Sequence, residues 1–157
     1  MQNLKRQNPK RQNLKRQNLK RQTPKRQTPK RQATKRILIV DDEASIQKVV
    51  GLSLKLEASW ESLTASSGHE GIAQAETHHP DAILLDVMMP ELDGISTFEA
   101  LSANPKTQSI PVILLTAKTG TAEKRLFQSI GVAGVITKPF NPLTLASEMA
   151  KLLDWTL

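Results

Sequence analysis

From residue 37 onward, short apolar runs alternate with longer amphipathic segments. The runs are about five residues long and rich in β-branched residues, which is typical of strands buried in a parallel sheet. Five strands are expected, at residues 37–40, 60–65, 82–85, 111–115 and 133–137. Five helices are expected between and after them, at residues 45–57, 70–77, 95–101, 121–130 and 141–153.

Local signals define the ends of two of these helices. Gly131 follows residues 121–130 and is the predicted C-cap of that helix. Asn141 is a good N-cap for the last helix, with Pro142 at its first position. The helix at residues 45–57 has an amphipathic pattern, in which the apolar positions are Ile46, Val49, Val50, Leu52, Leu54 and Leu56.

Strict alternation of strand and helix predicts an α/β fold, a doubly wound parallel sheet with helices on both faces. In such sheets ligands bind at the carboxyl ends of the strands. Polar residues stand at or just after the ends of four predicted strands, and these are Asp41, Asp42, Asp86, Thr116 and Lys138. Residues far apart in the chain are therefore expected to meet at one edge.

The residue types at this edge indicate phosphoryl chemistry. Three carboxylates without a nearby His or Cys form a hard oxygen site, which suits Mg²⁺. A lysine ammonium can pair with a phosphoryl oxygen, and a threonine hydroxyl can donate to another. A carboxylate can itself act as a nucleophile and form an acyl phosphate. The combination predicts formation of an aspartyl phosphate.

Four stretches resemble the receiver domain of two-component response regulators. They are ILIVDDE, ILLDVMMPELDG, PVILLTA and TKPF, in order and at the family's usual spacing. The resemblance implies a receiver domain over residues 37–157 with the flavodoxin-like strand order 2-1-3-4-5. It also implies phosphoryl transfer from a sensor histidine kinase or a phosphotransfer protein.

The resemblance assigns a role to each residue of this edge. Asp86 corresponds to the phospho-accepting aspartate. The implied Mg²⁺ ligands are Asp42, Asp86 and the backbone carbonyl of Met88, with Asp41 acting through water. Thr116 corresponds to the switch hydroxyl, Ala117 leaves room for the phosphate, and Lys138 pairs with it. The Lys138–Pro139 peptide is expected to be cis.

One position departs from the family pattern. Receivers usually carry an aromatic residue three positions before the lysine, and here that position is Val135. The chain has no Tyr. Weak propagation of the phosphorylation signal is therefore expected, and output is expected through contact with a downstream protein that the sequence does not name.

A different pattern precedes the predicted sheet. Residues 2–36 are seven five-residue units, each ending in Lys-Arg. A five-residue period makes no apolar stripe on a helix, and Pro9, Pro24 and Pro29 would interrupt one. Residues 1–36 are therefore predicted to be a disordered basic tail.

Charge divides the chain at the same boundary. The chain has 22 basic and 15 acidic residues, a net charge of +7. Residues 1–36 hold 14 Lys and Arg and no acid, whereas residues 37–157 hold 8 basic and 15 acidic residues. Two interpretations of the tail stay open: an arm that binds nucleic acid or another polyanion without base specificity, and a tolerated expansion of a short coding repeat.

Composition excludes several classes of protein. There is no Cys, which excludes disulfides, thiolate metal sites and thiol catalysis. No apolar run is long enough to span a membrane, and the N-terminus lacks the apolar region of a signal peptide, so a cytoplasmic location is expected. Dinucleotide binding is excluded because no Gly-x-Gly-x-x-Gly follows the first strand.

One enzyme class remains as an alternative. Haloacid-dehalogenase-like phosphohydrolases also use an aspartate at a strand end. They require Asp-x-Asp after the first strand, and here the spacing gives Asp41-x-Glu43. They also usually need a cap insertion, for which the loops here are too short. We therefore expect a phospho-acceptor without separate substrate turnover.

Overall fold

The computed structural model describes residues 34–117 and 120–157, which contain ten elements. The strands are β1 (Arg36–Val40), β2 (Glu61–Ala65), β3 (Ala82–Asp86), β4 (Val112–Thr116) and β5 (Gly134–Thr137). The helices are α2 (Ala44–Ala58), α3 (Gly68–His78), α4 (Gly94–Ala103), α5 (Thr121–Ile130) and α6 (Leu145–Leu153). Every predicted strand and helix is present. Within the described residues, no helix is both long and apolar enough to cross a membrane.

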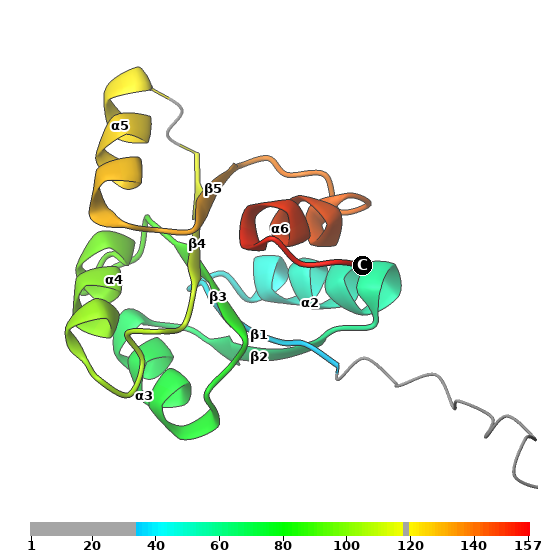
Figure 1. Ribbon diagram of the computed structural model, residues 1–157, viewed down its shortest axis with the longest axis horizontal. Coiled ribbons are helices and arrows are strands. Elements are labelled where there is room, and N and C mark those ends of the chain that lie inside the picture. The colour runs from blue at the N-terminus through cyan, green and yellow to red at the C-terminus, as the bar shows by residue number, and fades with distance from the viewer. Residues whose placement is uncertain (1–33, 118–119) are drawn as a thin grey trace, which may run out of the picture. The chain divides into compact units, whose positions relative to one another are not determined.

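The five strands form one parallel sheet in the order β2-β1-β3-β4-β5. This order confirms the predicted flavodoxin-like topology. Strand β1 lies between β2 and β3. The chain passes from β1 to the edge strand β2 and then crosses to β3, β4 and β5 on the other side of β1 (Figure 1). Strand order therefore places the carboxyl ends of β1 and β3 next to each other at the centre.

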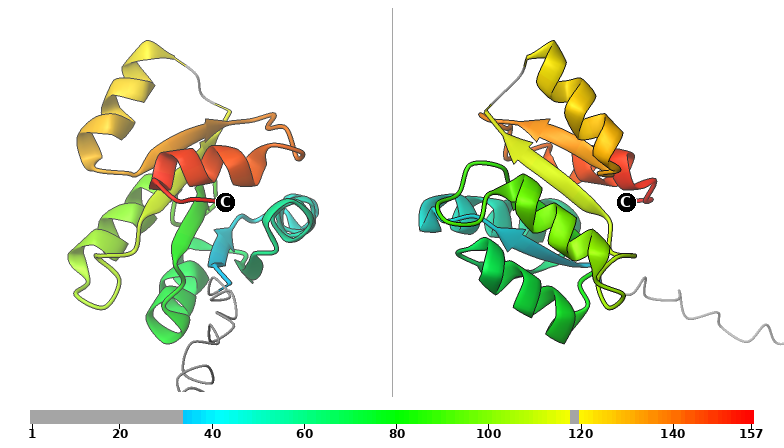
Figure 2. Two further views of the ribbon diagram at one scale, coloured as in Figure 1. Left: turned by 45° about the vertical axis from the view of Figure 1, so that its right-hand side comes forward. Right: turned by 90° about the vertical axis from the view of Figure 1, so that its left-hand side faces the viewer.

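Helices cover both faces of the sheet (Figures 1 and 2). Alternate residues of β1 point to opposite faces, as the two-residue period of a strand requires. Ile37 and Ile39 join the core beneath α2 and α6, whereas Leu38 and Val40 join the core beneath α3, α4 and α5. All four side chains are buried. This double burial explains the uninterrupted apolar run in the sequence.

The folded region begins slightly earlier than the predicted boundary at residue 37. Arg36 is already part of β1, and its guanidinium donates to the main-chain oxygen of His78 at 3.0 Å. The ammonium of Lys35 lies 4.6 Å from the ring centre of Trp155, a cation–π contact. The last Lys-Arg pair of the repeat therefore belongs to the fold. Residues 1–33 lie outside the described residues, so disorder of this part of the tail stays a prediction.

Helix α6 begins later than predicted. Asn141 accepts a hydrogen bond from the main-chain N–H of Leu143 and so caps a turn that precedes the helix. The α6 amides of Ala146 and Ser147 instead donate to the carboxylate of Glu57, at 2.8 and 2.9 Å. The predicted N-cap at Asn141 is wrong because a carboxylate on α2, distant in the sequence, takes that role.

The apolar positions of α2 do not all enter the core. Val50 and Leu54 are fully buried beneath the helix, but Val49, Leu52 and Leu56 are 42%, 61% and 76% exposed. Helix α2 therefore carries a second apolar stripe that faces outward.

The predicted C-cap of α5 is confirmed, since Gly131 has the left-handed conformation, with a φ of 95°.

Candidate functional site

The carboxyl edge of the sheet brings the predicted polar residues to the ends of four strands. Asp41 directly follows β1, and Asp86 is the last residue of β3. Thr116 is the last residue of β4, and Lys138 directly follows β5. Because β1 and β3 are adjacent and β4 follows β3, these residues meet at one place.

Lys138 joins the two buried carboxylates of this edge. Its ammonium nitrogen lies 3.4 Å from Oδ2 of Asp41 and 3.3 Å from Oδ1 of Asp86. The side chains of Asp41 and Asp86 are only 1% and 3% exposed. Their charges are therefore poorly solvated, and Lys138 offsets them. The Lys138–Pro139 peptide is cis, as predicted.

The electrostatics of the site follow from this burial. Desolvation raises the pKa of the Asp86 carboxyl, the Asp41 carboxylate raises it further, and Lys138 opposes the rise. Burial by itself would lower the pKa of the Lys138 ammonium, but the two carboxylates outweigh that effect and raise it. The lysine therefore stays protonated at neutral pH, and the site holds a fixed positive charge beside Asp86.

The three aspartates are placed so that they could share a metal ion. One carboxylate oxygen from each of Asp41, Asp42 and Asp86 lies within 4.8 Å of the other two. Asp42 is exposed at the surface, while the other two are buried. A set made only of carboxylate oxygens, open on one side to water, is the chemistry that Mg²⁺ prefers.

The remaining predicted site residues line the same edge. Thr116 is buried, and its main-chain oxygen accepts from the N–H of Lys138 at 2.8 Å. Ala117 follows it and is exposed. The N–H of Met88 donates to Oδ1 of Asp86 at 3.3 Å, and its side chain points into solvent. The fold brings all seven predicted residues to one edge of the sheet, and their assigned roles stay predictions.

Two further residues support the site. At Gly94 a Cβ atom would lie 2.4 Å from the main-chain oxygen of Asp86, so only glycine lets α4 begin this close to β3. Gln47 donates from its side chain to the main-chain oxygen of Asp41 at 2.7 Å. Gly94 lies within the ILLDVMMPELDG stretch, whereas no sequence signal marks Gln47.

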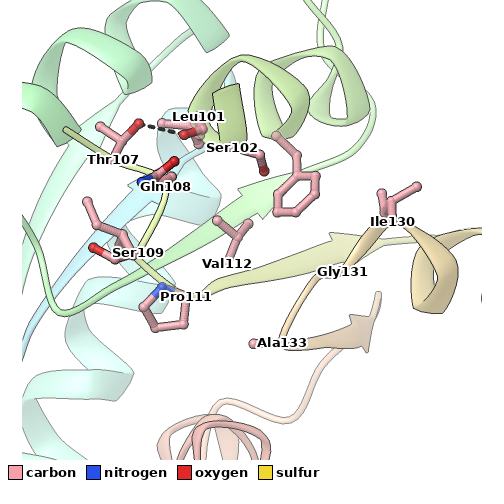
Figure 3. Close-up of a pocket in the computed structure, with 12 residues that line it drawn as sticks. Leu101, Ser102, Thr107, Gln108, Ser109, Pro111, Val112, Ile130, Gly131 and Ala133 are labelled. Atoms are coloured by element: carbon pink, nitrogen blue, oxygen red, sulfur yellow. Dashed lines mark hydrogen bonds between the residues drawn. The ribbon is translucent and has the colours of Figure 1, made fainter. Parts of the chain in front are cut away.

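A separate hollow of about 260 Å³ lies at the amino ends of the strands, where β4 begins (Figure 3). Thr107 and Gln108 line it on one side and Ile130 on the other, and the Thr107 hydroxyl donates to the main-chain oxygen of Leu101 at 2.7 Å. None of its lining residues is ionisable. The hollow therefore lacks the groups that phosphoryl chemistry requires.

The chain is similar to a known family and to curated proteins over the region that contains the site. Residues 37–150 match the family model of the response regulator receiver domain. The chain is 38% identical over 118 residues to the alkaline phosphatase synthesis transcriptional regulatory protein PhoP of Bacillus subtilis, a match of 75% of this chain and 48% of that protein. It is also 38% identical over 120 residues to the phosphate regulon transcriptional regulatory protein PhoB of Pseudomonas aeruginosa, covering 76% and 52%. The chain thus spans about half the length of these relatives.

Solved structures share the fold over the same region. The chemotaxis protein CheY4 of Vibrio cholerae superposes with a TM-score of 0.70 and 32% identity, covering 76% of this chain and 99% of that one. A putative response regulator from Chloroflexus aurantiacus gives a TM-score of 0.70 and 30% identity, covering 77% and 98%. Both similarities concern about three quarters of the chain.

Proposed function

The chain belongs to the response regulator receiver domain family, and on that premise we propose that Asp86 is the phospho-acceptor of a phosphorelay. The observation that carries this proposal is the position of Asp86, a buried carboxylate 3.3 Å from the Lys138 ammonium and beside the Asp41 carboxylate. The phosphodonor is a phosphohistidine of a sensor kinase or of a phosphotransfer protein.

The transfer moves one phosphoryl group from nitrogen to oxygen. A carboxylate oxygen of Asp86 attacks the phosphorus of the phosphohistidine and forms a phosphorus–oxygen bond. The phosphorus–nitrogen bond breaks, and its electron pair returns to the donor imidazole. Lys138 lies where it can bind an oxygen of the transferred group, so it offsets the charge that accumulates on the phosphoryl oxygens.

The acidic cluster fits a Mg²⁺ ion, which would neutralise phosphoryl oxygens during transfer. Asp42 and Asp86 would bind it directly, Asp41 through water, and the main-chain oxygen of Met88 would add a further ligand. Thr116 would hold another phosphoryl oxygen through its hydroxyl. The small side chain of Ala117 would leave space for the group beside it.

We further propose that the chain stores the phosphoryl group and does not turn over a separate substrate. The main-chain N–H of Glu43 donates to the Asp41 carboxylate at 2.8 Å. The residue after the Asp41–Asp42 pair therefore stabilises the turn through its main chain. The position where the hydrolase class needs its second aspartate is Glu43 here, which supports a phospho-acceptor over the hydrolase alternative. Incubation with acetyl phosphate and Mg²⁺, followed by intact-mass measurement, should show one retained phosphate. Continuous release of inorganic phosphate from added phosphate monoesters would contradict the proposal.

An apolar groove between α2 and the turn that precedes α6 supports a docking position for the phosphodonor protein. Its volume is about 380 Å³, and its apolar walls are Val49, Leu52, Leu56, Pro142 and Leu143. Helix α2 begins two residues after Asp42, and the turn with Pro142 follows Lys138 closely, so both walls continue from chain segments of the site. An apolar helix face of the donor protein could cover this groove while presenting its histidine to Asp86.

Docking in this groove has its own test. Leu56→Asp places a charge on a side chain that is 76% exposed and outside the core. Phosphotransfer from the kinase should slow at least tenfold, while labelling by acetyl phosphate, which needs no docking surface, should be unchanged. Leu126→Asp on α5, 51% exposed, is the matched control. Equal kinase rates for Leu56→Asp and the unmodified chain would contradict donor docking here.

The charge division of the sequence favours a second function for residues 1–36. Fourteen cations without an acid can neutralise phosphates and release counterions, so we propose that this segment binds nucleic acid without base specificity. Binding should fall steeply as salt rises. Deletion of residues 1–33 should abolish it while sparing the Lys35 and Arg36 contacts. Undiminished binding by the truncated chain, or no binding by the full chain at low salt, would contradict this proposal.

A further inference from the structure

The side-chain amide of Gln47 links the ends of two adjacent strands. Its Nε2 lies 2.7 Å from the main-chain oxygen of Asp41 and 3.2 Å from that of Ala65. It also lies 3.1 Å from the hydroxyl oxygen of Ser66. Asp41 follows β1 and Ala65 ends β2, so one half-buried glutamine in the first turn of α2 holds both strand ends.

The same glutamine closes a circuit of hydrogen bonds around the turn that carries Asp42. The main-chain N–H of Glu43 donates to Oδ1 of Asp41 at 2.8 Å. The main-chain N–H of Gln47 donates to the oxygen of Glu43 at 3.2 Å, and its side chain returns to the oxygen of Asp41. The peptide between Asp41 and Asp42 is thus held by the glutamine at its oxygen.

Asp42 depends on this peptide for its position. Within residues 34–117 and 120–157, its carboxylate takes part in no hydrogen bond or ion pair, in contrast to Asp41 and Asp86. The peptide group is planar, so the Asp41 oxygen and the Cα of Asp42 lie in one rigid unit. Fixing that oxygen therefore fixes where the Asp42 side chain starts.

We propose that Gln47 is a positioning residue for Mg²⁺ binding, which holds the Asp41–Asp42 peptide so that the Asp42 carboxylate lies near Asp86. This inference rests on the proposed function, since it assigns Gln47 a role in the metal site of the phosphorelay. Residues that orient metal ligands typically contribute about 10- to 100-fold to metal affinity. Gln47 would act through Asp42 and would not contact the ion.

The test compares Mg²⁺ affinity with stability. Gln47→Met keeps a long unbranched side chain with high helix propensity and removes the amide donor. Its affinity for Mg²⁺ alone, measured by calorimetric or NMR titration, should fall at least about tenfold. The thermal midpoint of the metal-free variant should fall only modestly, because the variant loses hydrogen bonds that are partly exposed to water. Gln128→Met makes the same change on the exposed side of α5 and should bind Mg²⁺ normally.

Unchanged Mg²⁺ affinity in Gln47→Met would overturn the proposal, even if the variant were less stable. An equal loss in Gln128→Met would overturn it too. If Gln47→Met does not fold, the unmodified chain provides a second test. The side-chain amide protons of Gln47 should exchange more slowly than those of Gln128, and they should shift when Mg²⁺ is added. Exchange as fast as that of Gln128, without a shift, would overturn the proposal.

Failure of this inference is distinguishable from failure of the proposed function. If Gln47→Met binds Mg²⁺ normally while Asp86→Asn loses phosphate labelling, only the role of Gln47 is refuted. If Asp86→Asn retains full labelling, the phosphorelay assignment fails whatever the Mg²⁺ affinity of the Gln47 variant.

Discussion

The ammonium nitrogen of Lys138 lies 3.3 Å from Oδ1 of Asp86. The lysine side chain is 21% exposed and the aspartate 3%, so the pair is shielded from solvent but open on the lysine side. A phosphoryl group on Asp86 would carry about −1.5 to −2 charges, in place of the single negative charge of the carboxylate. The positive charge needed to receive it is therefore in place before transfer.

Replacing Lys138 should impair phosphorylation strongly. Lys138→Met removes the cation that faces both Asp41 and Asp86 while keeping a side chain of similar length. We expect labelling by acetyl phosphate to slow on the order of a hundredfold, because one preorganised charge is lost from the transition state. Time courses of phosphoprotein formation by intact-mass measurement check this. Lys151→Met, on the exposed side of α6, should label at the normal rate, and a normal rate for Lys138→Met would contradict the assigned role.

Replacing Asp42 should weaken Mg²⁺ binding. Asp42→Asn removes one charged ligand from the cluster, so the affinity for Mg²⁺ should fall at least about tenfold. The metal-free variant should melt at a slightly higher temperature, because one of three repelling carboxylates is gone. Calorimetric titration and thermal melts test both effects. Glu43→Gln is the matched control for the Asp42 variant. Undiminished phosphorylation of the unmodified chain in excess EDTA would refute a metal requirement.

The stability that the contact between α2 and α6 contributes should depend on pH. Burial would raise the pKa of Glu57, but the hydrogen bonds from the side chain and N–H of Ser147 and from the N–H of Ala146 outweigh it and lower the pKa. A carboxyl group with a lowered folded-state pKa stabilises the fold above its unfolded value of about 4.3. That stabilisation is lost as the pH falls through the folded-state pKa.

Glu57→Gln should therefore reduce stability at neutral pH by about 1 kcal/mol, the usual contribution of a helix cap. The difference from the unmodified chain should disappear at a pH below the folded-state pKa of Glu57. Urea unfolding at neutral and acidic pH measures this. Glu61→Gln, exposed on β2, should have little effect at either pH, and a loss of stability independent of pH would contradict the capping role.

Phosphorylation should perturb the far side of the domain only weakly. Val135 is half-buried in the core beneath α3, α4 and α5, at the position where receivers usually carry an aromatic residue. A β-branched side chain of this size has few rotamers and little reach. NMR shift changes on phosphorylation should be small across residues 121–153 and large around Asp86. Shifts of equal size in both regions would show that another residue carries the signal.

Sequence patterns predicted the sheet and the site because both depend on burial and strand ends. The apolar run before Asp41 and the one before Thr116 are buried on both faces, which their uninterrupted apolar character indicates. A parallel sheet then forces residues at neighbouring strand ends together. The roles of Asp86 and Lys138 needed the family resemblance in addition, since strand position alone does not separate nucleophile from ligand.

Contacts between distant segments escaped the sequence analysis. Asn141 has the side chain of an N-cap, yet Glu57 supplies the cap of α6 because the packing of α2 beside α6 brings its carboxylate there. Gln47 holds the turn at Asp41 through a side chain that looks like an ordinary polar residue of a helix. Leu56 matches the apolar pattern of α2 but faces outward. Periodicity shows which residues are apolar, not which of them a neighbouring element covers.

The central claim is that Asp86 accepts the phosphoryl group, and mapping the modified residue tests it most directly. The full chain is incubated with acetyl phosphate and Mg²⁺, the product is trapped by reduction of the acyl phosphate, and peptides are sequenced by mass spectrometry. We predict a single modified residue, Asp86, and no stoichiometric modification in Asp86→Asn. Asp81→Asn, an exposed aspartate at the opposite edge of the sheet, should be modified normally. Full modification of Asp86→Asn at another residue would contradict the account.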